Sequence, residues 1–228
     1  PHILIVDDDP KITKMLTAQL EVLDASVSTA DNGSEALEIV EKIDTDLVLL
    51  DVMMPGMDGF EVCKRIKEKP TTRQIPVILI TALEDLESRV KGIESGADDF
   101  LSKPVNYHEF LARTRSLIKN RQINRNYASL ESVLFSLANA VEAKDAYTQG
   151  HTERVSNLAV ALGSKIGMSD AEIVSLRMGG ILHDVGKIAT PKAILNKNGP
   201  LTDDEWVEMR AHPELGYRIC LPLAQSLG

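Results

Sequence analysis

Short apolar runs alternate with amphipathic stretches over the first 105 residues of the chain. The runs are too short for helices and lack polar alternation, a pattern typical of strands buried on both faces of a parallel sheet. Such strands are expected at residues 3–6, 47–50, 76–80 and 100–101, with a weaker one at 25–29. Helical spacing of apolar residues predicts helices near residues 12–23, 34–43, 60–68 and 83–95. This alternation predicts an α/β fold, a doubly wound sheet of five parallel strands over residues 1–105.

Residues at the expected helix ends add detail to this outline. Ser34 and Asp58 stand where N-caps are expected, and Pro10 fits the first position of the first helix. Gly96 is expected to end the fourth helix. Asp9 is interpreted as a turn residue.

Apolar residues keep helical spacing from residue 107 onward, and no convincing strand is visible there. No Gly or Pro occurs from Val105 through Gln149, which predicts one long helix, or two with a polar joint. A heptad seam lies within it, at Leu130, Leu134, Leu137 and Val141. Two interpretations of the seam stay open: it carries a signal between domains, or it packs on the core of the second domain.

The expected domain organisation follows from this change of pattern. Residues 1–105 form the α/β domain, residues 106–126 form its last helix and a helical linker, and residues 127–228 form an all-α domain.

Composition and charge narrow the classes of partner. A net charge of −9 argues against a broad electrostatic contact with nucleic acid, and an aromatic content of 4% argues against a stacking platform for single strands. Two distant cysteines form no CxxC motif, and no apolar run approaches the ~20 residues of a membrane span. A cytoplasmic protein that contacts neither nucleic acid nor membrane is expected. In an acidic chain, a solvated helix face is the favoured interpretation of the basic stripe Arg113, Arg115, Lys119, Arg121 and Arg125.

Polar side chains follow four of the predicted strands at their carboxyl ends. They are Asp7 and Asp8, Asp51, Thr81, and Lys103. In a parallel sheet these ends meet at one edge, where such folds bind ligands. Clustered carboxylates repel one another unless a cation lies among them, and oxygen ligands suit Mg²⁺. A carboxylate beside Mg²⁺ can attack phosphorus, and a hydroxyl and an ammonium can stabilise the transferred phosphoryl oxygens. Asp51 alone would be interpreted as a loop residue, but the whole set predicts an aspartyl phosphate at Asp51.

Four motifs in this region resemble the receiver domain of two-component response regulators, which has a flavodoxin-like fold. They are Ile-Leu-Ile-Val-Asp-Asp-Asp-Pro, Leu-Leu-Asp-Val-Met-Met-Pro-Gly-Met-Asp-Gly, Ile-Thr-Ala and Gly-Ala-Asp-Asp-Phe-Leu-Ser-Lys-Pro. The resemblance implies phosphorylation of Asp51 by a sensor histidine kinase. It implies Asp8, Asp51 and the Met53 carbonyl as Mg²⁺ ligands, with Asp7 holding metal-bound water. Thr81 and Lys103 would bind the phosphoryl group. Phe100 would swing inward on activation, and the Lys103–Pro104 bond is expected to be cis.

Three histidines and an aspartate stand out in the second half. His183 and Asp184 are adjacent and follow Gly179 and Gly180, whose small size would let another helix approach closely. Neutral imidazoles and a bridging carboxylate can hold two metal ions that activate water toward a phosphodiester. A single His-Asp pair is weak evidence, and a hydrogen-bonded pair of helices is its alternative interpretation. The set of Gly150-His151, His183-Asp184-Val-Gly-Lys187 and His212-Pro-Glu-Leu-Gly216 strengthens the metal interpretation.

That set resembles the start of an HD-GYP domain, the branch of the HD superfamily that hydrolyses cyclic di-GMP. The resemblance implies His151, His183, Asp184 and His212 as ligands of Fe or Mn, or another divalent transition metal, and Lys187 as a contact to substrate phosphate. Tyr147 stands where some members carry a glutamate ligand, which argues against a third metal. His2 and His108 fit neither motif and are assigned to the surface.

The family's later paired-histidine segment, Gly-Tyr-Pro motif and further Asp ligand are absent before Gly228, so the helical domain corresponds to a partial HD-type bundle. An apolar face of this partial bundle is expected to be exposed or paired with another chain. The expected function is a response regulator that controls a metal-dependent cyclic di-GMP phosphodiesterase, with catalysis by this chain itself left open. The alternative is a non-enzymatic, phosphorylation-driven switch for dimerisation or partner binding, with a homodimer formed through the linker helix. An HD nucleotidase has less support, because the stretch after Lys187 resembles the cyclic-dinucleotide branch.

Overall fold

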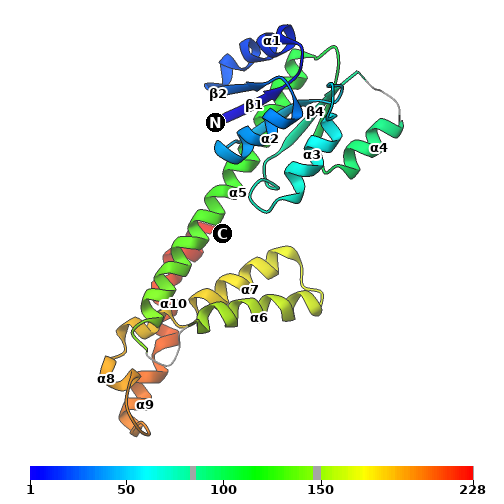
Figure 1. Ribbon diagram of the computed structural model, residues 1–228. Helices are drawn as coiled ribbons and strands as arrows, with labels where there is room; N and C mark the ends of the chain where they lie inside the picture. Colours follow the sequence, from blue (N-terminus) through cyan, green and yellow to red (C-terminus); the bar gives the residue numbers. More distant parts are fainter. Residues whose placement is uncertain (83–85, 146–149, 228) are drawn as a thin grey trace. The chain divides into compact units, whose positions relative to one another are not determined.

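The computed structural model describes residues 1–82, 86–145 and 150–227, which form two compact units, Pro1–Asn126 and Tyr127–Gly228 (Figure 1). The division falls inside α5 (Tyr107–Glu142), which is a single helix of 36 residues without a break at the polar joint. Tyr147 lies outside the described residues.

The first unit contains a five-stranded, all-parallel sheet in the order β2-β1-β3-β4-β5. Its strands are β1 (His2–Val6), β2 (Ser26–Ala30), β3 (Leu47–Asp51), β4 (Val77–Thr81) and β5 (Asp99–Ser102). The unbroken apolar runs became the strands whose residues are buried throughout, β3 and β4. The predicted doubly wound α/β fold is confirmed.

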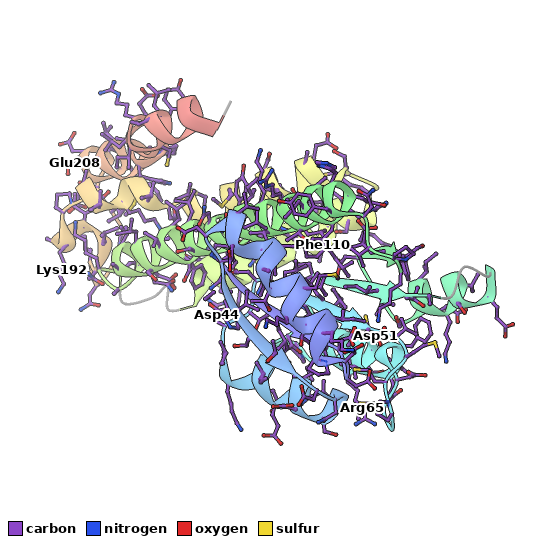
Figure 2. All side chains as sticks on the ribbon, turned by 90° about the horizontal axis from the view of Figure 1, so that it is seen from above. Asp44, Asp51, Arg65, Phe110, Lys192 and Glu208 are labelled. Carbon is purple, nitrogen blue, oxygen red and sulfur yellow. The ribbon has the colours of Figure 1, made fainter. Side chains whose placement is uncertain are left out.

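Helices cover both faces of this sheet (Figure 1). They are α1 (Pro10–Leu20), continued by the 3₁₀ helix η1 (Glu21–Leu23), α2 (Gly33–Lys42), α3 (Gly59–Glu68), α4 (Leu86–Glu94) and α5. Alternate residues of β1 enter different cores: Ile3 packs in the cluster with α1 and α5, and Leu4 in the cluster with α2 and α3. Phe110 of α5 is fully buried in the first of these clusters (Figure 2).

Short polar side chains cap the helices of the first unit. Asp58 accepts a hydrogen bond from the Glu61 N–H at 2.8 Å, as predicted for the N-cap of α3. The prediction for Ser34 is wrong, because Asn32, two residues earlier, is the N-cap of α2 and Ser34 lies inside the helix. Asp9 is the N-cap of α1 rather than a simple turn residue.

The second unit is helical throughout its described residues. It contains α6 (His151–Lys165), α7 (Asp170–Leu182), the 3₁₀ helix η2 (Val185–Ala189), α8 (Lys192–Leu195), α9 (Asp203–Arg210) and α10 (His212–Leu227), besides the last part of α5. Capping boxes start α7, with Ser169 and Glu172, and α9, with Thr202 and Glu205. Helices α6 and α7 pack side by side as a hairpin (Figure 1).

The heptad seam of α5 is only partly buried. Leu134 is 6% exposed and Ala138 is 5% exposed, whereas Leu137 is 56% exposed. The buried stripe therefore differs from the predicted seam at this position. Helix α6 and its C-cap residue present a second apolar stripe to solvent, at Leu158, Leu162 and the C-cap Ile166. These residues are spaced four apart and lie on one side of the helix, as expected for an exposed apolar face.

The basic stripe of α5 is not a purely solvated face. Arg125 forms ion pairs with Asp44 and, at 2.9 Å, with Asp46, while Arg121 donates to Gln74 at 3.2 Å. These contacts lie within the first unit and hold the part of α5 that follows its buried turns. Among the described residues, no helix is both long enough and apolar enough to span a membrane.

Candidate phosphorylation and metal sites

The carboxyl end of the parallel sheet gathers the predicted acidic and basic side chains. Asp51 is the last residue of β3 and is 4% exposed, and Asp7 directly follows β1 and is 2% exposed. The Lys103 ammonium lies 2.9 Å from Asp51 Oδ1 and 3.0 Å from Asp7 Oδ2. Residues separated by as many as 96 positions in the sequence thus meet as expected.

This cluster is electrostatically unbalanced. Burial raises the pKa of Asp7, and the neighbouring Asp51 charge adds to the rise, against the opposing effects of the Asp9 N–H and Lys103. Burial alone would lower the pKa of Lys103, but its hydrogen bonds to Asp51 and Asp7 outweigh burial and raise it. One ammonium therefore pairs with two buried carboxylates, and a third carboxylate, the exposed Asp8, lies near both of them.

The donor set fits a magnesium ion. Oxygen atoms of Asp7, Asp8 and Asp51 lie within 4.8 Å of one another, and Asp8 is exposed, so further coordination positions face solvent. Met53 follows two residues after β3 and is 61% exposed. The Lys103–Pro104 bond is cis, as predicted.

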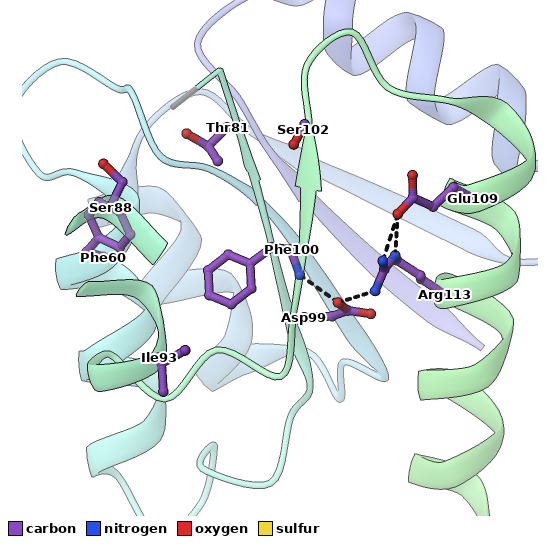
Figure 3. A pocket seen from close by; sticks show the side chains of 9 residues that line it. All are labelled: Phe60, Thr81, Ser88, Ile93, Asp99, Phe100, Ser102, Glu109 and Arg113. Carbon is purple, nitrogen blue, oxygen red and sulfur yellow. Dashed lines mark hydrogen bonds and ion pairs between the residues drawn. The ribbon is translucent and has the colours of Figure 1, made fainter. Parts of the chain in front are cut away.

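Thr81 ends β4 and is 7% exposed. It lines a hollow of about 290 Å³ together with Phe100 and Ser102 of β5 (Figure 3). The half-buried Phe100 ring contacts α4: a Cβ on Gly92 would lie 2.2 Å from its Cε1 atom. Sequence reasoning missed Gly92, for which the only available signal was a glycine inside a helical pattern.

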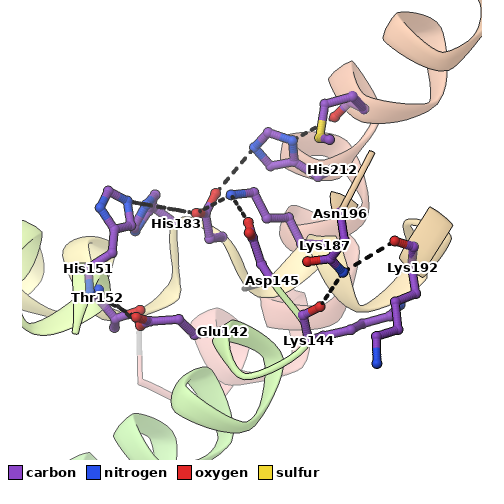
Figure 4. Close-up of polar contacts among 12 residues, drawn as sticks. Glu142, Lys144, Asp145, His151, Thr152, His183, Lys187, Lys192, Asn196 and His212 are labelled. Atoms are coloured by element: carbon purple, nitrogen blue, oxygen red, sulfur yellow. Dashed lines mark hydrogen bonds and ion pairs between the residues drawn. The ribbon is translucent and has the colours of Figure 1, made fainter. Parts of the chain in front are cut away.

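The second unit brings the predicted histidines and aspartate together (Figure 4). His151 begins α6, His183 and Asp184 follow α7, and His212 begins α10. The His151 and His183 Nε2 atoms are 3.2 Å apart and lie 3.9 Å and 3.3 Å from Asp184 Oδ2. The His212 Nε2 atom lies 3.5 Å from Asp184 Oδ1. Three separate helical elements therefore converge on one carboxylate.

Backbone contacts orient two of these imidazoles. His183 Nδ1–H donates to the Gly180 carbonyl at 2.8 Å, and His212 Nδ1–H donates to the Met209 carbonyl at 2.7 Å. Each bond leaves the Nε2 lone pair directed toward the cluster, the usual arrangement of a metal-binding histidine. Ligand atoms of His151, His183 and Asp184 lie within 4.8 Å of one another. The donor set therefore fits a divalent transition metal.

Asp184 also holds the predicted lysine. Lys187 Nζ lies 2.7 Å from Asp184 Oδ2 and 3.7 Å from Asp145 Oδ2. Burial would raise the pKa of Asp184, but the Lys187 hydrogen bond and the adjacent His183 outweigh it and lower the pKa. Sequence reasoning did not assign Asp145 a role.

Glu142 is a second missed residue of this site. Its carboxylate accepts the backbone N–H groups of His151 at 2.8 Å and Thr152 at 3.1 Å, which are unpaired donors at the start of α6. The preceding residue Gly150 adopts φ +70°, a conformation that favours glycine, and offers no capping side chain. A cap from the end of another helix leaves no local sequence signal.

Replacing Glu142 with Gln is expected to lower the free energy of unfolding of the second unit by about 1 kcal/mol near pH 7, the usual value of a cap. Burial would raise the pKa of Glu142, but its hydrogen bonds to Thr152 and His151 outweigh burial and lower it. A lowered folded pKa means that this contribution is present above pH 4.5 and disappears as the pH falls through the folded pKa. Urea unfolding at several pH values measures the difference, with Glu208→Gln on the exposed surface of α9 as control. A difference that persists unchanged in acid contradicts the assignment.

Both units match known families. Residues 3–115 match the response regulator receiver domain, and residues 148–227 match the HD domain. The chain is 36% identical over 239 residues to the cyclic di-GMP phosphodiesterase response regulator RpfG of Xanthomonas campestris, covering 96% of this chain and 63% of that protein. It is 34% identical over 243 residues to a cyclic di-GMP phosphodiesterase of Thermotoga maritima, covering 95% and 65% respectively.

A solved structure is similar to the first unit. The receiver domain of an HD domain-containing protein from Pseudomonas fluorescens is 29% identical, with a TM-score of 0.51, over 54% of this chain and 97% of that one. The fold and the acidic site define a receiver domain, joined here to a helical domain with a histidine-aspartate cluster. The chain belongs to the response regulators that combine a receiver domain with an HD domain. It spans less than two thirds of the length of both curated relatives.

Proposed function

We propose that this protein is a response regulator in which phosphorylation of Asp51 controls a metal-dependent cyclic di-GMP phosphodiesterase. The observation that carries the proposal is the convergence of His151, His183 and His212 on Asp184 beside Lys187. The two curated relatives, named as cyclic di-GMP phosphodiesterases, support the choice of substrate.

The chemistry proposed for the receiver starts at Asp51. Its carboxylate attacks the phosphorus atom of a phosphohistidine on a sensor kinase, forming a P–O bond as the P–N bond breaks. Lys103, already within 3.0 Å of both Asp7 and Asp51, would follow the incoming phosphoryl oxygens, and Thr81 would donate its hydroxyl to them. Mg²⁺ held by Asp8, Asp51 and the Met53 carbonyl, with Asp7 holding its bound water, would neutralise charge on the transferring group. The Phe100 ring is proposed to swing inward when Asp51 is phosphorylated.

The chemistry proposed for the helical unit is hydrolysis of a phosphodiester. His151, His183, Asp184 and His212 would hold Fe or Mn, which supplies a Lewis acid and an activated water when bound. Lys187 is held by two carboxylates at the edge of the cluster, where its ammonium would bind a substrate phosphate oxygen. The contact with Asp184 orients that ammonium.

A second candidate function is a switch that acts by association of two chains. The exposed stripe of Leu158, Leu162 and Ile166 favours it, because adjacent exposed apolar residues commonly mark interaction surfaces. In that case phosphorylation of the receiver would change oligomeric state without turnover.

Turnover of cyclic di-GMP by the 228-residue chain with added Mn²⁺ or Fe²⁺ separates the two candidates. The expected result is a linear product, resolved by chromatography, that His183→Ala does not form. Absence of product from the wild-type chain, together with a light-scattering mass that rises with beryllofluoride, would instead support the association switch.

A further inference from the structure

Two glycines, Gly180 and Gly186, flank the His183–Asp184 pair, and each faces the backbone of another element. A Cβ on Gly180 would lie 2.7 Å from the Cα atom of Ser156 in α6. A Cβ on Gly186 would lie 1.9 Å from the His212 carbonyl oxygen and 2.6 Å from the Gly216 nitrogen in α10. Backbone atoms cannot rotate away as side chains can, so an added methyl group must move the elements apart.

Each contact involves the helix that bears one of the other two histidines. Gly180 touches α6, which begins at His151, and Gly186 touches His212 itself at the start of α10. A Cβ atom in ordinary contact lies at least 3.4 Å from its neighbour, but a Cβ on Gly186 would lie 1.9 Å from the His212 carbonyl oxygen. The two backbone segments would therefore have to separate by the difference between these distances. Metal ligands must be held within about 0.5 Å of their working geometry, which is a smaller distance than this displacement.

We propose that Gly180 and Gly186 are positioning residues of the metal cluster: Gly180 sets the place of His151, and Gly186 sets the place of His212. The histidine-aspartate pair lies between them and provides the fixed centre. This inference rests on the proposed metal site and adds residues that act through the ligands.

The chain offers a matched control for each glycine. Gly179 precedes Gly180 in the same helix, but a Cβ there would meet no atom within 4 Å. Gly216 faces Gly186 across the same contact, yet a Cβ on it would lie 3.4 Å from the Gly186 nitrogen, an ordinary distance. Both controls lie inside helices, where alanine is favoured over glycine.

The test is titration of the full chain with Mn²⁺ alone, in an Asp8→Asn background that weakens the acidic cluster of the receiver. Gly186→Ala and Gly180→Ala are each expected to weaken Mn²⁺ binding by about 10- to 100-fold, the usual effect of losing a group that orients a ligand. Gly179→Ala and Gly216→Ala are expected to bind as the parent does. Equal losses in all four variants would overturn the proposal.

Double variants separate positioning from general loosening. In a His212→Ala background, Gly186→Ala should cause no further loss of Mn²⁺ affinity, whereas in a His151→Ala background it should cause its full loss. Gly180→Ala should cause no further loss with His151→Ala and its full loss with His212→Ala. Losses of the same size in both backgrounds would contradict the assignment. If Gly186→Ala does not fold, as judged by circular dichroism, the Gly180 and Gly179 pair decides.

Imidazole NMR of the metal-free chain provides a readout that needs no metal. Gly186→Ala should shift the signals of His212 and leave those of His151 unchanged, and Gly180→Ala should do the opposite. A parent chain that binds no Mn²⁺ would refute the metal part of the proposed function, while the NMR pattern would still decide this inference. Identical shifts in both variants would overturn it.

Discussion

Replacing Asp51 with Asn is expected to abolish uptake of a phosphoryl group from acetyl phosphate in the presence of Mg²⁺. The amide oxygen is a poor nucleophile, and the variant loses the ion pair with Lys103, which is 2.9 Å long in the wild-type protein. The rate should fall by at least about 10³-fold, on the scale seen when other enzymes lose a nucleophile. Intact-protein mass spectrometry counts the added group directly.

The free energy of unfolding of this variant should change far less than its phosphorylation rate. Removal of the Asp51 charge relieves its repulsion with the buried Asp7. Asp58→Asn is a matched control, because asparagine caps a helix about as well as aspartate and Asp58 is the N-cap of α3. The control should take up one phosphoryl group as the wild type does. Uptake by Asp51→Asn at the wild-type rate would refute the assignment of the phosphorylation site.

Replacing His183 with Ala is expected to weaken Mn²⁺ binding in the helical unit by at least about 100-fold. His183 Nε2 lies 3.2 Å from His151 Nε2 and 3.3 Å from Asp184 Oδ2, so its loss removes a central ligand of the cluster. The effect should exceed the 10- to 100-fold loss typical of groups that only orient a ligand. The same titration in the Asp8→Asn background measures it.

His108→Ala serves as the control for this variant, because His108 is exposed and lies in the first turn of α5. It should leave Mn²⁺ binding unchanged. Binding by His183→Ala at the affinity of the parent chain would remove the metal hypothesis and leave the hydrogen-bonded interpretation of the His-Asp pair.

The acidic site of the receiver could be predicted from sequence because unbroken apolar runs mark where the buried parallel strands end. A parallel strand that ends at Asp51 must place that residue on the same edge as the ends of β1 and β4, regardless of the loops between them. The ends of helices were harder to predict: Ser34 and Asn32 are both good N-cap residues, and the N-cap of α2 lies two residues before the predicted one. Local pattern alone does not resolve such a choice.

The helical unit shows where sequence reasoning stops. Gly179 and Gly180 looked equivalent, but neighbours on a helix point about 100° apart, and only Gly180 meets α6. The first unit offers a parallel case: Arg125 was interpreted as a solvated residue, yet it pairs with Asp44 and Asp46, about 80 residues earlier in the chain. Contacts of this kind depend on packing between elements, which periodicity does not describe.

Glu142 closes α5 and caps α6, so the helix that begins at Tyr107 ends on the backbone N–H groups of His151 and Thr152. Opening of the last turn of α5 would release His151, the first ligand of the proposed metal cluster. The two equilibria are therefore thermodynamically linked, and the link is reciprocal. With the proposed metal bound, a change that lowers the population of the closed turn would lower metal affinity by a corresponding factor, and the metal would protect the amides of that turn from hydrogen exchange. Hydrogen exchange of the amides at the end of α5 would therefore report both the order of this helix and the occupancy of the proposed metal site.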